Sequence, residues 1–149
     1  MKQKFRDAYM KVAETFAELS SARRLHVGAI VVKEDRIISI GYNGMPSGWD
    51  NNCEFEFKHP QTKITELVTR AEVLHAETNA IAKLAKSTES GDGATMFVTH
   101  APCMDCAKLI YQSGINSVLY RNSYKSDDGI NFLAKAGVSV EKLNKAESE

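Results

Sequence analysis

Hydrophobic residues near the N-terminus recur at the spacing of one helix face. Two runs rich in β-branched residues follow at 27–32 and 36–40, and Glu34-Asp35 between them is typical of a tight turn. The sequence therefore predicts an amphipathic helix followed by a β-hairpin. The apolar stripe of the helix consists of Phe5, Ala8, Tyr9, Val12, Ala13, Phe16 and Leu19.

The rest of the chain alternates between helix-like and strand-like segments. Such alternation is typical of parallel crossover units, in which helices cover both faces of a sheet. We therefore expect an α/β fold, a three-layer α-β-α sandwich with a five-stranded mixed sheet, as a single domain over residues 1–149. The predicted segments are helices over 75–86, 102–113 and 128–136, and strands over 94–99, 115–120 and 138–143.

Three segments lack a clear period. Residues 41–48 are dense in turn formers, and the tail 144–149 is polar and expected to fray. Residues 49–64 show no pattern, and the helix over 75–86 could begin as early as Thr65. Because so long an irregular loop is uncommon in a compact domain, we expect 49–64 to serve function or assembly.

Charge and composition exclude some classes of protein. The chain has 19 basic and 19 acidic residues among 149, so its net charge is zero, which argues against a nucleic-acid polymer as partner. No apolar run is long enough for a membrane span, and the N-terminus lacks the apolar region of a secretory signal. Three cysteines cannot all pair with one another, and we expect a reduced, cytoplasmic setting in which they bind metal or catalyse.

Two short motifs carry the candidate chemistry. His75-Ala76-Glu77 and Pro102-Cys103-Met104-Asp105-Cys106 each lie at the start of a predicted helix. Thiolates one turn apart at a helix N-terminus are favoured by the helix dipole and free amides. One histidine and two cysteines give three protein ligands, the number typical of a catalytic zinc site. Glu77 is then placed to accept and return a proton as general acid and base, and this order of residues is a signature of zinc nucleobase deaminases.

Other interpretations of these residues remain open at this point. The two cysteines could form a redox pair, although that leaves His75 and Glu77 unexplained. His100 could complete a closed structural zinc site. Cys53 and His59 could supply half of a second metal site, although a free thiol at Cys53 is the simpler interpretation.

Both motifs and the segments around them resemble the zinc-dependent cytidine and deoxycytidylate deaminases. The similarity spans residues 5–140 and is clearest at 27–32, 36–46, 75–81 and 99–103. The resemblance implies a fold of the cytidine deaminase type and hydrolysis of deoxycytidylate (dCMP) to dUMP and ammonia, which supplies dUMP for thymidylate synthesis. It also implies that zinc is the metal bound by the histidine and the two cysteines.

The same resemblance implies contacts to the substrate. Asn43 would lie near the 3′-hydroxyl of the deoxyribose, and the backbone amide of Ala76 would help to fix the base. Tyr124 matches a tyrosine near the phosphate. Arg23 matches a segment that contacts the phosphate, for which the guanidinium fork is well suited, and Arg24 is an even choice between that role and surface exposure.

Regulation and assembly also follow only from the resemblance. It implies a homohexamer that dCTP with Mg²⁺ activates and dTTP inhibits, with Gly41, Tyr42 and Gly44 as candidates for the regulatory site. A cytoplasmic location is expected, or the host cytoplasm for a viral protein. The alternatives are a deaminase of cytidine or of tRNA adenosine, and a nucleotide sensor without catalysis.

Overall fold

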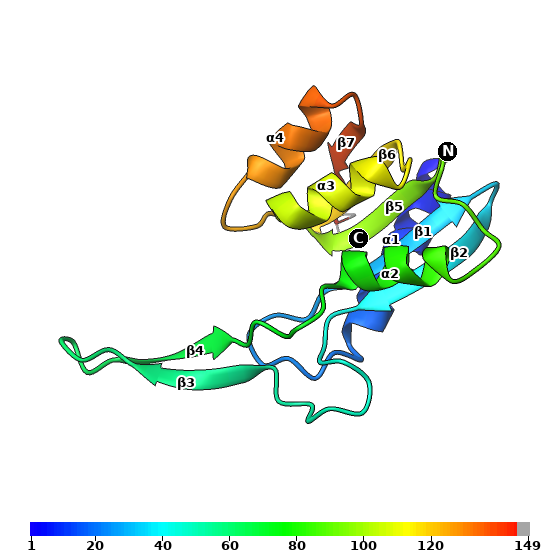
Figure 1. The fold of residues 1–149 in the computed structure, drawn as a ribbon. Helices are drawn as coiled ribbons and strands as arrows, with labels where there is room; N and C mark the ends of the chain where they lie inside the picture. Colours follow the sequence, from blue (N-terminus) through cyan, green and yellow to red (C-terminus); the bar gives the residue numbers. More distant parts are fainter. Residues whose placement is uncertain (146–149) are drawn as a thin grey trace.

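The computed structural model describes residues 1–145, and the predicted frayed tail falls mainly outside this range. Figure 1 shows the arrangement of the helices and strands. In chain order they are α1 (Gln3–Ala17), β1 (Gly28–Lys33), β2 (Arg36–Tyr42), β3 (Glu54–Lys58), β4 (Thr65–Thr69), α2 (Ala76–Ala85), β5 (Thr95–His100), α3 (Met104–Gln112), β6 (Ser117–Asn122), α4 (Asp128–Lys135) and β7 (Ser139–Lys142).

The main sheet has five strands in the order β2-β1-β5-β6-β7. Strands β2, β1 and β5 pair antiparallel, whereas β5, β6 and β7 pair parallel, which confirms the predicted five-stranded mixed sheet. Glu34 and Asp35 have φ angles of 52° and 58°, the left-handed values that a tight turn between two antiparallel strands requires. The β1–β2 hairpin is therefore confirmed together with its turn.

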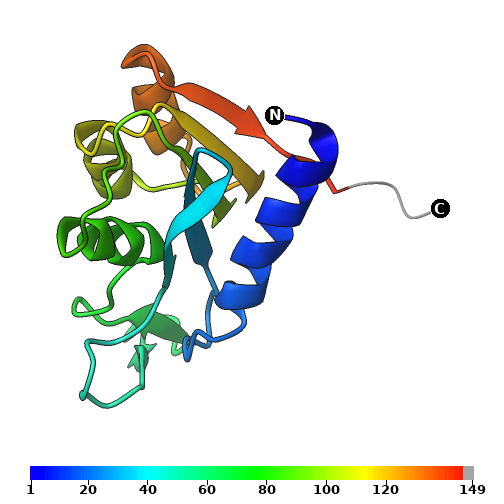
Figure 2. The ribbon, with the colours of Figure 1, turned by 90° about the vertical axis from the view of Figure 1, so that its right-hand side faces the viewer.

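Helices cover both faces of this sheet and complete the predicted three layers. In Figure 2, α1 lies along one face, while α2, α3 and α4 lie on the other. On the α1 side, Met10 and Ala13 pack against Ile30 and Phe97, and all four are fully buried. The helix is therefore confirmed, but its predicted apolar stripe is only partly right: the buried residues are Met10, Ala13 and Ala17, whereas Phe5 and Leu19 are 49% and 59% exposed.

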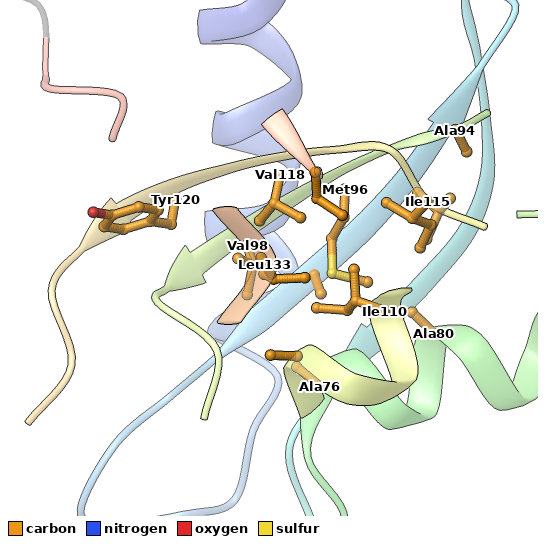
Figure 3. Close-up of a cluster of buried hydrophobic side chains, with 14 of the residues drawn as sticks. Ala76, Ala80, Ala94, Met96, Val98, Ile110, Ile115, Val118, Tyr120 and Leu133 are labelled. Atoms are coloured by element: carbon orange, nitrogen blue, oxygen red, sulfur yellow. The ribbon is translucent and has the colours of Figure 1, made fainter. Parts of the chain in front are cut away.

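The larger part of the core lies between the sheet and the helices α2, α3 and α4. Figure 3 shows side chains of this core, which come from the helices α2, α3 and α4 and from the strands β5 and β6. Ala76 and Ala80 on α2 and Ile110 on α3 meet Met96 and Val98 on β5, all of them fully buried. The small side chains of Ala76 and Ala80 let α2 pack closely against the sheet.

The expectation that residues 49–64 are irregular is wrong in part, because β3 lies within them and forms a second β-hairpin with β4. Strands β3 and β4 pair antiparallel from Glu54 with Thr69 to Lys58 with Thr65, so the optional helix start at Thr65 is also wrong. Figure 1 shows this hairpin extending away from the body of the molecule. Charged and aromatic residues alternate from Glu54 to Lys58, which is a strand signal that the interpretation of the sequence missed. In the structure Phe55 and Phe57 remain exposed, at 40% and 42%.

Within the described residues, no helix combines the length and the apolar composition that crossing a membrane requires.

Candidate active site

The N-termini of α2 and α3 bring the two sequence motifs together. His75 is the residue that immediately precedes α2, and Cys103 holds the same place before α3. The Nδ1 atom of His75 lies 3.3 Å from the Sγ atom of Cys106 and 3.7 Å from that of Cys103. All three donor atoms lie within 4.8 Å of one another, so the structure positions these residues to bind one metal ion.

The donor set fits zinc in both chemistry and spacing. Ligands about 2.0–2.3 Å from a tetrahedral zinc ion lie about 3.4–3.8 Å apart, close to the separations measured from His75. Among the described residues, only one group of three or more His, Cys, Asp or Glu side chains lies close enough to hold a metal ion, and it consists of His75, Cys103 and Cys106. Neither His100 nor the pair Cys53 and His59 adds a ligand to this group. Three protein donors leave a fourth position for water or substrate, as in catalytic zinc sites.

The two thiols are electrostatically unequal. Hydrogen bonds from Cys106 and His75 lower the pKa of the Cys103 thiol to about 4. The hydrogen bond with Cys103 and burial raise the pKa of the Cys106 thiol, and the hydrogen bond with Cys103 raises the pKa of His75. Both thiols would lose their protons on binding a divalent cation.

Glu77 lies in the first turn of α2, two residues after His75. Its side chain is only 4% exposed, and burial raises the pKa of its carboxyl group. A carboxyl group whose pKa is raised holds a proton more readily and is suited to accepting and returning protons. The glutamate of the first motif therefore has the environment that a general acid and base needs.

A cavity of about 500 Å³ opens over this cluster. His75, Glu77 and Cys103 contribute to its wall, so a molecule in the cavity can reach both the metal ligands and the carboxylate. The other residues that line it are Ala22, Arg24, Leu25, Val27, Asn43, Cys53, Glu54, Thr69, Val73, Ala76, His100, Ala101, Asn122, Ser123, Tyr124 and Lys125.

Three of the residues predicted to contact substrate line this cavity. Asn43 donates from Nδ2 to the Leu25 carbonyl at 2.8 Å and accepts the Val27 amide at Oδ1 at 2.9 Å, so its side chain also holds the segment before β1. Ala76 is fully buried at the start of α2. Tyr124 lies beside Lys125, whose Nζ is 5.6 Å from the centre of the tyrosine ring.

The two arginines of the predicted phosphate segment have different surroundings. Arg24 lines the cavity, and one of its guanidinium nitrogens donates to the Thr69 hydroxyl at 3.1 Å. The guanidinium of Arg23 instead donates to Asn52 at 3.1 Å and lies 3.6 Å from a carboxylate oxygen of Glu54. The structure therefore places Arg24 in the cavity wall, whereas the Arg23 guanidinium interacts with Asn52 and Glu54.

The cavity residues that were not singled out from the sequence include Lys125, Glu54 and Thr69. Lys125 follows the predicted Tyr124 directly, and a search for a second cation in that segment would have found it. Glu54 and Thr69 become neighbours only through the β3–β4 pairing, and the alternation of charged and aromatic residues over 54–58 could have indicated the first of these strands.

The candidate regulatory residues have clear structural roles next to α2. A Cβ atom at Gly41 would lie 2.2 Å from the Ala76 carbonyl oxygen, so only glycine fits there. The Tyr42 carbonyl accepts a hydrogen bond from the Asn79 side chain at 2.8 Å. Gly44 exchanges two backbone hydrogen bonds with Leu74, the residue before His75, at 3.1 and 2.8 Å. These contacts fix the start of α2, and a regulatory role for the three residues stays a prediction.

Comparison with known proteins agrees with this site. The family model described as the cytidine and deoxycytidylate deaminase zinc-binding region matches residues 3–122. That range includes α1 to β6 and all three candidate metal ligands. The chain therefore belongs to the cytidine and deoxycytidylate deaminase family.

Several relatives share most of the chain. The deoxycytidylate deaminase of Enterobacteria phage T4 is 32% identical over 166 aligned positions, which cover 88% of this chain and 86% of the phage protein. The human deoxycytidylate deaminase is 37% identical over 121 positions, covering 80% of this chain and 65% of the human one. The crystal structure of the dCMP deaminase from cyanophage S-TIM5 in complex with dCMP and dUMP is 48% identical, covers 96% of this chain and 99% of its own, and superposes with a TM-score of 0.86.

Proposed function

We propose that this protein is a dCMP deaminase that converts dCMP and water into dUMP and ammonia. The observation that carries the proposal is the buried Glu77 carboxyl beside the cluster of His75, Cys103 and Cys106 in one open cavity. A dCMP deaminase with 48% identity and a complex containing dCMP and dUMP supports the choice of substrate. In this proposal residues 1–149 act as one deaminase domain.

The proposed mechanism assigns proton transfer to Glu77. His75, Cys103 and Cys106 would hold zinc, which would make a water molecule nucleophilic at neutral pH. Glu77 takes one proton from this water and donates it to N3 of the cytosine while the water oxygen bonds to C4. Glu77 then takes the remaining proton from that oxygen and passes it to the amino group, so that the C4–N bond breaks, ammonia leaves and the carbonyl of dUMP forms.

The remaining cavity residues orient the nucleotide. The backbone amide of Ala76 contacts the base and Asn43 lies beside the sugar hydroxyl. We assign the phosphate to Arg24, Tyr124 and Lys125, because all three line the cavity while Arg23 interacts with Asn52 and Glu54. A guanidinium can bind two phosphate oxygens at once. Two local cations are sufficient for one small phosphate, consistent with a chain whose net charge is zero.

Regulation and assembly remain part of the proposal. We expect activation by dCTP with Mg²⁺, inhibition by dTTP and a hexamer in the cytoplasm. A smaller groove of about 380 Å³ follows the 41–48 loop, and Arg70 places a cation in it. Its other lining residues are Met45, Trp49, Asp50, Asn52 and Glu72.

A substrate panel tests the proposed activity. Purified zinc-loaded protein is assayed for ammonia release with dCMP, deoxycytidine, cytidine and an unmodified tRNA, with and without dCTP or dTTP. The highest kcat/KM is expected for dCMP. Turnover of cytidine or tRNA above that of dCMP would contradict the assignment, and binding of nucleotide without ammonia release from any substrate would identify a sensor.

A further inference from the structure

Two residues face each other across the base of the β3–β4 hairpin, where it joins the body of the protein. Glu54 begins β3, Thr69 ends β4, and the two are direct cross-strand partners. Both line the active-site cavity. The rest of the hairpin extends outward in Figure 1, so this pair is the part of the hairpin that reaches the site.

Glu54 binds the backbone of the segment that carries the two arginines. Its carboxylate accepts the Arg24 amide at 2.8 Å and the Arg23 amide at 2.9 and 3.1 Å. The side chain is only 1% exposed, and these hydrogen bonds together with the Arg23 guanidinium at 3.6 Å compensate its buried charge. The Glu54 carboxylate thus fixes the backbone position of Arg24 and keeps the Arg23 guanidinium beside the cavity wall.

Thr69 binds the guanidinium end of Arg24. Its hydroxyl oxygen accepts a hydrogen bond from the Arg24 guanidinium at 3.1 Å. Arg24 lies between α1 and β1 in a segment without helix or strand, so its own element does not hold it in place. Backbone and side chain are therefore restrained by the two partners of one cross-strand pair.

We propose that Glu54 and Thr69 are positioning residues that direct Arg24 toward the phosphate of the bound nucleotide. This inference rests on the proposed function, in which Arg24 contacts that phosphate. An arginine restrained before binding loses less conformational freedom when the ligand arrives, which strengthens binding without a further contact. The inference also gives the hairpin a role in substrate recognition, because its first and last paired residues form the support for Arg24.

Removal of the threonine hydroxyl tests this role. Thr69→Val is expected to weaken binding of dUMP by about three- to tenfold while leaving binding of deoxyuridine, which lacks the phosphate, unchanged. KM for dCMP should rise with kcat near the wild-type value. Isothermal titration calorimetry and steady-state kinetics on the zinc-loaded protein give both measurements.

Thr65→Val is the matched control. Thr65 lies on the same strand, is exposed like Thr69, and pairs with Lys58 at the far end of the hairpin. The variant makes the same chemical change in the same strand, away from Arg24. Its affinity for dUMP should equal that of the wild type.

A double mutant decides whether the effect passes through the arginine. Arg24→Ala alone should weaken dUMP binding more than Thr69→Val does, and adding Thr69→Val to it should cause no further loss. Glu54→Gln is expected to reduce the preference for dUMP over deoxyuridine as well, and the Thr69→Val result decides the matter even where Glu54→Gln does not fold.

Three results would overturn the inference. They are an equal loss of dUMP and deoxyuridine affinity in Thr69→Val, a further loss when Thr69→Val is added to Arg24→Ala, and wild-type dUMP affinity in Arg24→Ala. Failure of the proposed function is distinguishable, because it appears as absence of dCMP deamination in the wild-type protein, whereas these results concern binding.

Discussion

The Nδ1 atom of His75 lies 3.3 Å from the Sγ atom of Cys106, although 31 positions separate the two residues in the chain. The contact exists because α2 and α3 both begin on the same side of the sheet, with His75 and Cys103 preceding their first turns. Both helix N-termini also direct free amides toward the cluster, where they favour thiolate charge. Metal binding and proton transfer therefore depend on the relative position of two helix ends.

Loss of a cysteine ligand should remove the metal. Cys106→Ala is expected to reduce the zinc content of the purified protein from about one equivalent per chain to a small fraction, because two ligands hold zinc weakly. Cys53→Ala is the matched control, since Cys53 is buried and lines the cavity but lies outside the metal cluster. Inductively coupled plasma mass spectrometry measures both. Full zinc content in Cys106→Ala would contradict the ligand assignment.

Replacement of the proposed proton carrier should abolish turnover while leaving the metal in place. Glu77→Gln keeps the shape of the side chain and removes its basicity, so kcat is expected to fall by about 10²–10⁴-fold. Zinc content should remain at the wild-type level. Glu56→Gln makes the same change at an exposed position on β3 and should leave kcat unaltered. A Glu77→Gln enzyme with near wild-type kcat would refute the assigned role.

The buried carboxyl should also affect stability, with a defined dependence on pH. Burial raises the pKa of Glu77 above its ordinary value of 4.5, so above pH 4.5 the unfolded chain releases the proton more readily than the folded protein. The free energy of unfolding of the zinc-free wild-type protein should therefore fall, relative to that of Glu77→Gln, as pH rises from about 4.5 through the raised pKa.

Denaturant unfolding in the presence of EDTA at several pH values between 4 and 8 measures this difference. Well below pH 4.5 the difference between wild type and Glu77→Gln should become independent of pH, because Glu77 is then protonated in both the folded and the unfolded state. The exposed-site variant Glu56→Gln should show no such growing difference. A constant gap between wild type and Glu77→Gln over the whole range would contradict the interpretation.

A methyl group at Gly41 should disturb the active site through packing. Gly41→Ala places a Cβ atom 2.2 Å from the Ala76 carbonyl oxygen and 2.7 Å from the Ala80 amide nitrogen, so α2 must move. We expect a loss of about 1–3 kcal/mol in the free energy of unfolding together with lower kcat, because α2 carries Glu77. Thermal unfolding and dCMP kinetics measure the two effects.

Gly44 provides the control for this substitution. No atom lies within 4 Å of a Cβ built at Gly44, so Gly44→Ala should change the free energy of unfolding by less than about 0.5 kcal/mol. Equal destabilisation by Gly41→Ala and Gly44→Ala would show that the lack of space between Gly41 and α2 does not cause the loss of stability.

The sequence alone determined the elements of the main sheet, its three layers and the zinc cluster with Glu77. Each of these is encoded locally, by β-branched runs, by helical spacing of apolar residues, or by two motifs whose ligand types fit one metal. Both motifs lie at predicted helix N-termini, and their ligand types together complete one metal site. The proximity of His75 to Cys103 and Cys106 could therefore be inferred from the sequence.

Tertiary structure alone decided the pairing of β3 with β4 and which of the two arginines lines the cavity. The alternating residues of Glu54–Lys58 could indicate a strand, but no buried face of the hairpin indicated its partner or the register that joins Glu54 to Thr69. The two arginines are adjacent and chemically identical, and only the position of the Glu54 carboxylate and the Thr69 hydroxyl separates them. Long-range contacts of this kind depend on how the strands pair, which local hydrophobic pattern does not encode.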